Sequence, residues 1–279
     1  MKIKAVYQTI GAYIALMRAY MSILVGVTAV CGMFLSSASV DNNKAILSFL
    51  AQCLITAGGF ALNDILDRDR DSTVTYKPLV AGTISIANAR LVTMITIGLG
   101  LIISFSLGIL PFAIVCAQTI IVYAYSYIKL RSGITANLIT AALCGSSFLY
   151  GAAVQAHLGQ AWIPALLTVE FIAAREIVKD LLDEEPDRLA NVPTIPVRYG
   201  YCWTRLSVLL LVTLTVVTSM FPGIRNTFGT GYVIMMGTVD LVLVLATLFL
   251  LRRLDRIGAG RFLLVTAIAF PAAISAFFL

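Results

Sequence analysis

The sequence predicts an all-α integral membrane protein. Hydrophobic residues make up 59% of the 279 residues and charged residues only 12%, and the mean hydropathy is +0.94. Apolar runs of about 20 residues, the length that crosses a bilayer as a helix, recur along the whole chain. The net charge of +6 is explained by membrane topology and by contact with anionic lipid or substrate, so it does not indicate a nucleic-acid partner.

About nine membrane-spanning helices are expected from these runs. Before the first span, Gln8 and Arg18 interrupt any short apolar run, which argues against a cleavable signal peptide and favours an amphipathic helix on the membrane surface. The third and fourth spans are separated only by a turn near Gly108 and Pro111. The expected spans are residues 20–38, 45–66, 89–107, 111–130, 134–156, 161–182, 202–222, 230–251 and 261–279.

The distribution of Lys and Arg predicts a cytoplasmic N-terminus. With that orientation only Lys44 and Arg225 fall on the outer side, which leaves 18 of the 20 basic residues on the cytoplasmic side. This bias agrees with the positive-inside rule. The same topology brings the ends of the second and sixth spans to the cytoplasmic face.

Ten of the 14 acidic residues lie in two patches, one at the C-terminal end of the second span and one at the C-terminal end of the sixth. The patches can be laid over one another so that Asp64 matches Asp180, Asp67 matches Asp183 and Asp71 matches Asp187. Carboxylates this crowded repel one another unless a cation lies between them, and oxygen ligands together with substrate phosphates suit Mg²⁺. One such patch would be an ordinary solvated helix end. Two in matching register predict the two halves of a metal site for a phosphorylated, lipid-like substrate.

The spacing i, i+3, i+7 predicts that the matched carboxylates of each patch share one helical face, within an arc of about 60°. Asp69 and Glu185 would point the opposite way and are expected to be solvated. Pro186 disfavours a helical conformation at Glu185. The second helix is therefore expected to end near Asp183, with Asp187 on the following turn.

These motifs resemble those of the UbiA superfamily of intramembrane prenyltransferases. The family's first motif, Asn-Asp-x-x-Asp-x-x-x-Asp, is matched by Asn63, Asp64, Asp67 and Asp71. Its second, Asp-x-x-x-Asp, is matched by Asp183 and Asp187, and its Tyr-x-x-x-Lys element by Tyr125 and Lys129. The three motifs occur in the family's order, and the likeness runs from about residue 18 to the last span.

The resemblance implies about nine helices around a central cavity, within a single transmembrane domain over residues 1–279. It also implies two pseudo-repeats, roughly 18–130 and 134–251, each with one Asp-rich motif. The implied activity is Mg²⁺-dependent transfer of an isoprenyl group from an isoprenyl diphosphate to a lipophilic or aromatic acceptor. The reaction would proceed through ionisation of the allylic diphosphate, at a site that faces the cytoplasm.

Electrostatics agrees with this implication, because a diphosphate carries about three negative charges and needs divalent ions to approach so many carboxylates. Two Mg²⁺ ions are expected. The expected metal ligands are Asn63, Asp64, Asp67, Asp71, Asp180, Asp183 and Asp187. The expected diphosphate-binding residues are Asn63, Arg68, Lys129, Lys179 and Arg188. The residues expected to act in catalysis are Asp64, Asp67, Asp71, Asp183, Asp187, Tyr125 and Lys129.

Other residues leave the acceptor open. The family usually follows its first motif with Arg-Pro-x-Pro-x-Gly, whereas this chain reads Lys-Pro-Leu-Val-Ala-Gly from Lys77 onward, and we expect Lys77 to contact the acceptor or to form part of a lid. Glu170 and Asp240 lie within predicted spans, where carboxylates are costly and often functional. Glu170 could contact the acceptor or act as a base, but for both Glu170 and Asp240 a hydrogen bond to a Ser, Thr or Tyr of a neighbouring helix is favoured.

The five cysteines show no zinc-binding spacing, and His157 lies far from the acidic patches along the chain.

Two alternative functions remain at this stage. A terpene cyclase of the same family would need the same Asp motifs but would form a hydrocarbon or alcohol without a second substrate. A cation-coupled transporter is disfavoured because the carboxylates cluster at one predicted membrane edge and not at the midplane.

The topology can be tested by cysteine labelling in a variant that lacks the five native cysteines. We expect Asp69→Cys to react with an impermeant maleimide from the cytoplasmic side and Leu279→Cys to react from the outer side, because of the positive-inside bias. Lys44→Cys serves as the control for outer access. Labelling of position 69 from the outer side alone would contradict the predicted orientation.

Overall fold

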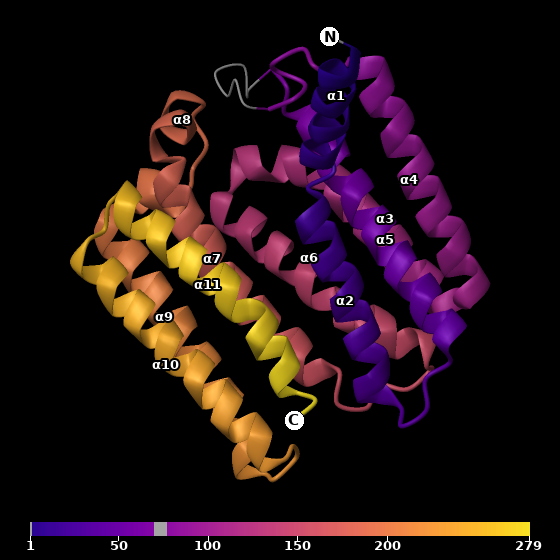
Figure 1. Cartoon of the computed structure of the whole chain (residues 1–279). Helices are drawn as coiled ribbons and strands as arrows, with labels where there is room; N and C mark the ends of the chain where they lie inside the picture. Colours follow the sequence, from indigo (N-terminus) through magenta and orange to yellow (C-terminus); the bar gives the residue numbers. More distant parts are fainter. Residues whose placement is uncertain (1, 70–76) are drawn as a thin grey trace. The chain divides into compact units, whose positions relative to one another are not determined.

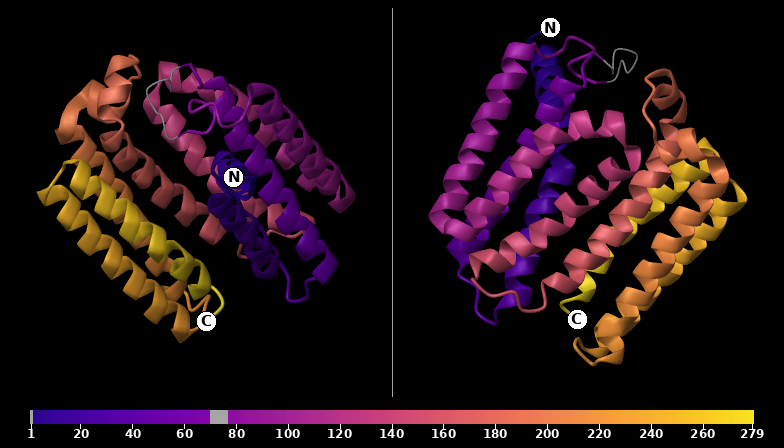
Figure 2. Two further views of the ribbon diagram at one scale, coloured as in Figure 1. Left: turned by 45° about the horizontal axis from the view of Figure 1, so that its top comes forward. Right: turned by 180° about the vertical axis from the view of Figure 1, so that it is seen from behind.

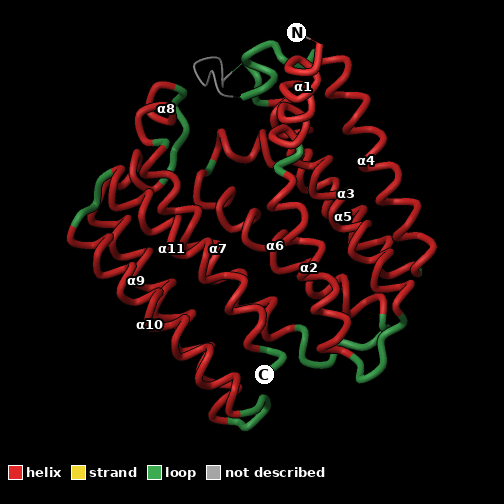
Figure 3. Tube along the Cα trace, viewed as in Figure 1, coloured by secondary structure: helices red, strands yellow, loops and turns green. Residues whose placement is uncertain are grey.

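The computed structural model describes residues 2–69 and 77–279, and every regular element in these ranges is a helix (Figures 1 and 3). Eight of these helices are long and apolar enough to cross a membrane. They are α2 (Ala19–Ser36), α3 (Asn42–Leu66), α4 (Ile86–Leu107), α5 (Ile109–Arg131), α6 (Gly133–Val154), α9 (Ile195–Ile224), α10 (Thr230–Arg252) and α11 (Arg256–Ala276). The predicted all-α integral membrane class is confirmed.

A further long helix, α7 (Trp162–Leu182), takes the place of the predicted sixth span. It is less apolar than the others because its C-terminal half carries Arg175, Glu176, Lys179 and Asp180. Each predicted span thus corresponds to one helix of the described chain. The helix expected before the first span is α1 (Lys2–Leu16), and a six-residue helix, α8 (Glu184–Leu189), follows α7.

The helices form two compact units. The first comprises Met1–Tyr127 and Ser146–Trp162, and the second comprises Ile128–Gly145 and Ile163–Leu279. The border crosses α5 and α6, so each of these helices contributes to both units. The first Asp motif belongs to the first unit, whereas Lys129 and the second Asp motif belong to the second. The pseudo-repeat halves at 18–130 and 134–251 stay a prediction.

In the first unit, small residues bring α2 and α6 into backbone contact. A Cβ added at Gly151 would collide with the carbonyl oxygen of Ala29, and one added at Gly32 would collide with the backbone of Phe148. Such small-residue contacts are typical of helices that pack in membranes, where lipid gives no hydrophobic drive for association. The Tyr150 side chain is fully buried in this part of the unit.

The N-terminal helix α1 covers the end of α3 that carries the first Asp motif. Ala12 and Leu16 of α1 pack with Ala61 of α3 and with Leu79 and Ile84 of the segment that leads into α4. This apolar contact fixes the junction between α1 and α2 beside the end of α3. The short α1 is therefore part of the scaffold of the first motif.

In the second unit, α7 is the central helix. Its Ala174 and Val178 are almost fully buried against Val208 of α9, Leu243 of α10 and Phe262 of α11. Helices α9, α10 and α11 run side by side in both views of Figure 2, and adjacent pairs are in contact. This packing fixes the direction of α7 and hence the position where the second Asp motif begins.

Two details of the second unit differ from a simple hydropathy reading. Helix α9 begins at Ile195 and not near residue 202, and Gly200 interrupts it with a left-handed φ of 77° that favours glycine. Helix α11 begins after Asp255, whose side chain accepts hydrogen bonds from Arg253 Nε (2.7 Å) and from the Gly258 N–H (2.8 Å). These donors, Arg253 first, hold the pKa of Asp255 below its usual value.

The α2–α6 contact predicts a stability effect. We expect Gly151→Leu to lower the free energy of unfolding in detergent by about 1–3 kcal/mol or more, because the side chain must push α6 away from the α2 backbone. Gly98→Leu is the matched control, since nothing lies within 4 Å of an added Cβ at Gly98 of α4. Thermal unfolding in one detergent measures both. Equal stability of the two variants would contradict the close contact.

Candidate functional site

Both Asp motifs begin at the end of a long helix. Helix α3 ends at Leu66, and the N–H of the next residue, Asp67, donates to the carbonyl oxygen of Asn63 at 2.9 Å. Helix α7 ends at Leu182, and the N–H of Asp183 donates to the carbonyl oxygen of Lys179 at 3.2 Å. The two motifs match in sequence, and they also share a local structure, because each begins where a long helix ends.

The three carboxylates of the second motif do not lie on one helix: Asp187 lies in α8 and not on α7, as expected from Pro186. Pro186 has no N–H to donate to Leu182, four residues earlier, so the helical hydrogen bonding stops there. Instead, Arg256 of α11 donates to the Leu182 carbonyl oxygen at 3.1 Å. The expected end of the helix near Asp183 is confirmed. In the first motif α3 likewise ends before the third carboxylate, and Asp71 lies outside the described residues.

In the first motif, two cations converge on one oxygen of Asp64. The side chain of Asp64 is buried, and its Oδ1 lies 3.3 Å from a terminal nitrogen of Arg18 and 3.2 Å from Lys77 Nζ. The neighbouring Asn63 accepts a hydrogen bond from Ser126 of α5 at 3.2 Å through its Oδ1. Asp67 is also buried. The predicted residues Asn63, Asp64 and Asp67 are thus brought together at one helix end.

Arg18 is a residue that sequence reasoning did not assign to the site. It connects α1 to α2 in a left-handed conformation (φ 43°, ψ 55°), and its guanidinium lies 4.5 Å from the centre of the Phe60 ring. Phe60 is one helical turn before Asp64 on α3. The stacked ring limits the motion of the guanidinium, so the charge stays close to the carboxylate.

Lys77 reaches Asp64 from a compact turn. The N–H of Ala81 donates to the Lys77 carbonyl oxygen at 2.9 Å, and the N–H of Thr83 donates to the Pro78 carbonyl oxygen at 3.0 Å. Gly82 has a left-handed φ of 70°, which allows the chain to turn toward α4. The stretch where this chain departs from the family pattern thus holds its lysine against the first motif.

The second motif has its own fixed partners. Asp180 is buried, and its Oδ2 accepts a hydrogen bond from Nδ2 of Asn137 on α6 at 2.8 Å. Asp187 is also buried, and its Oδ1 lies 3.9 Å from Lys129 Nζ at the end of α5. Lys129 of the Tyr-x-x-x-Lys element thus lies beside the second motif, and Tyr125 is half-buried on α5. Asn137 was not predicted.

The remaining predicted cations lie at the surface beside other carboxylates. Arg68 lies 3.8 Å from Asp69, which is 98% exposed, as expected for a solvated residue. Lys179 lies 3.2 Å from Glu176. Arg188 donates at 2.6 Å to Glu184, which also accepts from Tyr201 at 2.8 Å. Glu185 is exposed, as predicted.

The two carboxylates within spans are hydrogen-bonded by neighbouring hydroxyl groups. Thr218 of α9 donates to Glu170 at 3.1 Å, and the adjacent Ser219 donates to Asp240 of α10 at 2.6 Å. This agrees with the interpretation that each accepts a hydrogen bond from a hydroxyl group on a nearby helix, although Oε2 of Glu170 is buried without a partner among the described residues. The expected role of Glu170 toward the acceptor stays a prediction.

The donors in both motifs are carboxylate and amide oxygens, which suit Mg²⁺ better than zinc or copper. Within residues 2–69 and 77–279, no three His, Cys, Asp or Glu side chains form a ready metal-binding group. Each motif instead holds its buried carboxylates against basic or amide side chains. The chemistry of the donor set fits the predicted metal.

Residues 25–276 match the UbiA prenyltransferase family. The chain belongs to this family. It is similar to the digeranylgeranylglyceryl phosphate synthase of Thermococcus kodakarensis, with 31% identity over 95% of this chain and 96% of the relative. This prenyltransferase is therefore an integral membrane enzyme.

Solved structures agree in fold. A structure described as digeranylgeranylglyceryl phosphate synthase in membranes is 28% identical, with a TM-score of 0.78 and 97% of each chain covered. A UbiA homologue from Archaeoglobus fulgidus, bound to GPP and Mg²⁺, is 19% identical, with a TM-score of 0.67, and covers 96% of this chain and 100% of its own. At that identity the second likeness concerns the fold alone.

The motif geometry predicts a large effect on activity. We expect Asp64→Asn and Asp183→Asn to slow prenyl transfer by roughly a thousandfold, because each change replaces a predicted metal ligand by a weaker one of the same size. Asp69→Asn, at an exposed position next to the first motif, is the matched control and should keep near-normal rates. Product formation at saturating Mg²⁺, with thermal unfolding as a check on folding, measures this. Near-normal rates in both motif variants would refute the two-motif metal site.

Proposed function

We propose that this enzyme transfers an isoprenyl group from an allylic diphosphate, held with Mg²⁺, to a hydroxyl group of a phosphorylated glycerolipid. The observation that carries the proposal is the pairing of buried carboxylates with fixed cations in both motifs. Arg18 and Lys77 lie on Asp64, and Lys129 lies beside Asp187. Carboxylates can hold a divalent ion while the cations bind phosphate oxygens, so the two residue types together suit a metal diphosphate.

The donor side of the proposal rests on the oxygen ligands. Bound Mg²⁺ would neutralise the charge that develops on the diphosphate as the allylic C–O bond breaks. Asp64 and Asp67 in the first motif, and Asp183 and Asp187 in the second, are the carboxylates proposed to bind Mg²⁺. Lys129 is proposed to bind a diphosphate oxygen, since its ammonium is fixed beside Asp187 in a partly buried position.

The part of the proposal that concerns the acceptor rests on Arg18 and Lys77. Two cations on one carboxylate provide more positive charge than Asp64 alone requires, and a planar guanidinium suits a phosphate. The relative from Thermococcus kodakarensis is named for a product that carries a glyceryl phosphate. We therefore assign to Arg18 and Lys77 the binding of the acceptor's phosphate.

The proposed reaction is an ether-forming substitution. The acceptor's hydroxyl oxygen bonds to the allylic carbon, the diphosphate leaves with the electrons of the broken C–O bond, and the hydroxyl proton is released. Residues that exclude water from the allylic carbon would favour the acceptor over hydrolysis. The buried state of Asp64, Asp67 and Asp187 is consistent with such a site.

The proposal can be tested with purified enzyme, Mg²⁺, geranylgeranyl diphosphate and a panel of acceptors, with products identified by mass spectrometry. We expect a Mg²⁺-dependent ether product with an isoprenylated glycerol phosphate, and none with an aromatic acid or with the same lipid lacking its phosphate. A terpene formed without any acceptor would favour the cyclase alternative. Transfer to an aromatic acceptor alone would contradict the assigned acceptor.

Two lysine variants separate the substrate roles in the same assay. Lys129→Ala is expected to slow diphosphate ionisation by about 30- to 1000-fold, equivalent to ~2–4 kcal/mol of transition-state stabilisation. Lys77→Ala is expected to raise the KM for the phosphorylated acceptor more than the KM for the diphosphate. Each substrate is varied at saturating concentrations of the other. The reverse pattern would overturn the assigned roles and leave the family membership intact.

A further inference from the structure

Arg256, the first residue of α11, reaches the end of α7 from a distant part of the chain. A terminal nitrogen of its guanidinium donates to the carbonyl oxygen of Leu182 at 3.1 Å. Leu182 is the last residue of α7, and in a continuing helix its carbonyl would accept from the N–H of residue 186, which is a proline. The arginine thus satisfies a carbonyl group at a helix end, where the helix dipole also favours a cation.

This contact fixes the peptide group that joins Leu182 to Asp183. The N–H of the peptide group donates to the Lys179 carbonyl oxygen at 3.2 Å, and its C=O accepts from Arg256. Because the peptide group is planar, bonds at its two opposite ends set the direction in which the chain leaves α7. The Asp183 carbonyl oxygen then accepts from the N–H of Asp187 at 2.8 Å. The position of Asp183 therefore also sets the start of α8.

Arg256 extends from a compact turn between α10 and α11. The side chain of Asp255 accepts from Arg253 Nε at 2.7 Å and from the Gly258 N–H at 2.8 Å. A Cβ added at Gly258 would collide with the carbonyl oxygen of Arg253, so the turn closes tightly over this glycine. The base of the Arg256 side chain therefore has a defined position beside the end of α7.

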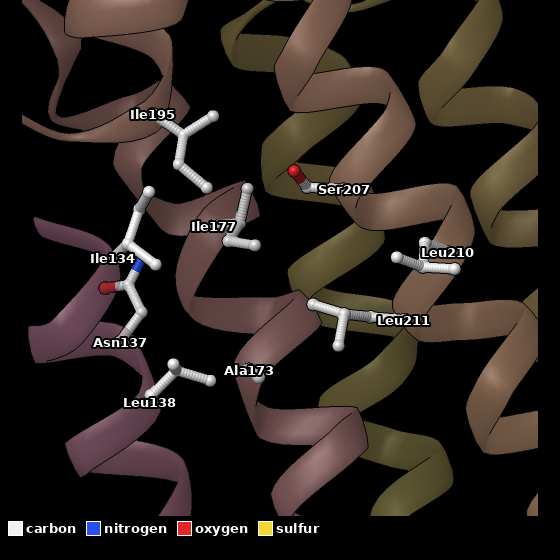
Figure 4. Close-up of a pocket in the computed structure, with 9 residues that line it drawn as sticks. All are labelled: Ile134, Asn137, Leu138, Ala173, Ile177, Ile195, Ser207, Leu210 and Leu211. Atoms are coloured by element: carbon white, nitrogen blue, oxygen red, sulfur yellow. The ribbon is translucent and has the colours of Figure 1, made fainter.

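Helix α7 also borders on a cleft. The cleft lies between α6, α7 and α9 and has a volume of about 210 Å³, and Ala173 and Ile177 line it from α7 (Figure 4). Along this face α7 lacks the close packing that is usual inside proteins. Hydrogen bonds therefore contribute more to the position of its last turns. One joins Asn137 to Asp180, and the bond from Arg256 lies next to Asp183.

We propose that Arg256 is a positioning residue for the second Asp motif, and that its bond to Leu182 holds Asp183 and Asp187 where they bind Mg²⁺. The inference rests on the proposed function, in which these two carboxylates bind the metal. Mg²⁺ requires a nearly ideal octahedral geometry, so a small displacement of its ligands weakens binding. Arg256 acts through the backbone and not by contact with the metal or the diphosphate.

Removing the donor tests this role. Arg256→Met keeps a long apolar stem but cannot donate, and we expect the Mg²⁺ concentration for half-maximal activity to rise roughly tenfold, as is typical when a group that orients metal ligands is lost. The KM for the acceptor at saturating Mg²⁺ should change far less. Arg256→Lys keeps a charged donor and should stay much closer to wild type. The matched control is Arg252→Met, an identical change at an exposed position at the end of α10.

Two measurements do not require turnover. Mn²⁺ binding, followed by electron paramagnetic resonance in the presence of an unreactive thio analogue of geranylgeranyl diphosphate, should weaken roughly tenfold in Arg256→Met and not in Arg252→Met. Hydrogen exchange at the Asp187 amide should become faster, because its acceptor on Asp183 is less well fixed. Asp255→Ala, which loosens the turn that carries Arg256, should shift Mn²⁺ binding in the same direction and replaces Arg256→Met if that variant does not fold.

The outcomes separate this role from general damage and from the proposed function. Wild-type Mg²⁺ dependence and Mn²⁺ affinity in folded Arg256→Met would overturn the positioning role. Equal weakening in Arg252→Met would also overturn it, because the loss would then reflect charge alone. If wild-type enzyme forms no ether with the phosphorylated acceptor, the proposed function fails, whereas weaker Mn²⁺ binding in Arg256→Met alone still supports the role of Arg256.

Discussion

The structure depends on the need to give every buried carboxylate a partner at the edge of an apolar membrane. A charge removed from water without compensation costs several kcal/mol, so an unaccompanied Asp cluster would not remain buried. Asp64 is paired with Arg18 and Lys77 and Asp187 with Lys129, whereas Asp180 accepts a hydrogen bond from the neutral amide of Asn137. Each of these partners comes from another helix or from a loop. The packing of those elements is therefore tied to the motifs, and residues that hold the fold also equip the site for anions.

The helices could be predicted from sequence because the bilayer imposes one length and one composition on them. The span predicted at 45–66 is α3, which ends at Leu66 in the structure. Prediction was poorer where polar residues extend a helix beyond its apolar run, as in α9, which starts at Ile195 and continues through the break at Gly200. Hydropathy does not detect a helical turn made of polar residues outside the apolar segment. The short polar helix α8 was not predicted for the same reason.

The Asp motifs could also be recognised in the sequence, because repetition at fixed spacing is visible along a chain. Their surroundings could not. Arg18 is 46 residues from Asp64 and Asn137 is 43 residues from Asp180, and no periodicity connects such pairs. The second motif leaves the helix for a local reason: Pro186 has no backbone N–H, and Arg256 donates instead to the carbonyl oxygen of Leu182. Pro186 allowed the end of α7 to be predicted from the sequence, but nothing in the sequence indicated the contact with Arg256.

The division of labour between the two units has an evolutionary consequence. Lys129, proposed to bind the diphosphate, lies in the second unit, whereas Arg18 and Lys77, proposed to bind the acceptor's phosphate, lie in the first. A substitution beside Lys129 need not disturb the cations on Asp64, and a change in those cations need not disturb Lys129. Under the roles proposed above, binding of the diphosphate and preference for the acceptor are separately heritable traits. Descendants of one ancestral gene can then acquire new pairings of substrates by altering one unit at a time.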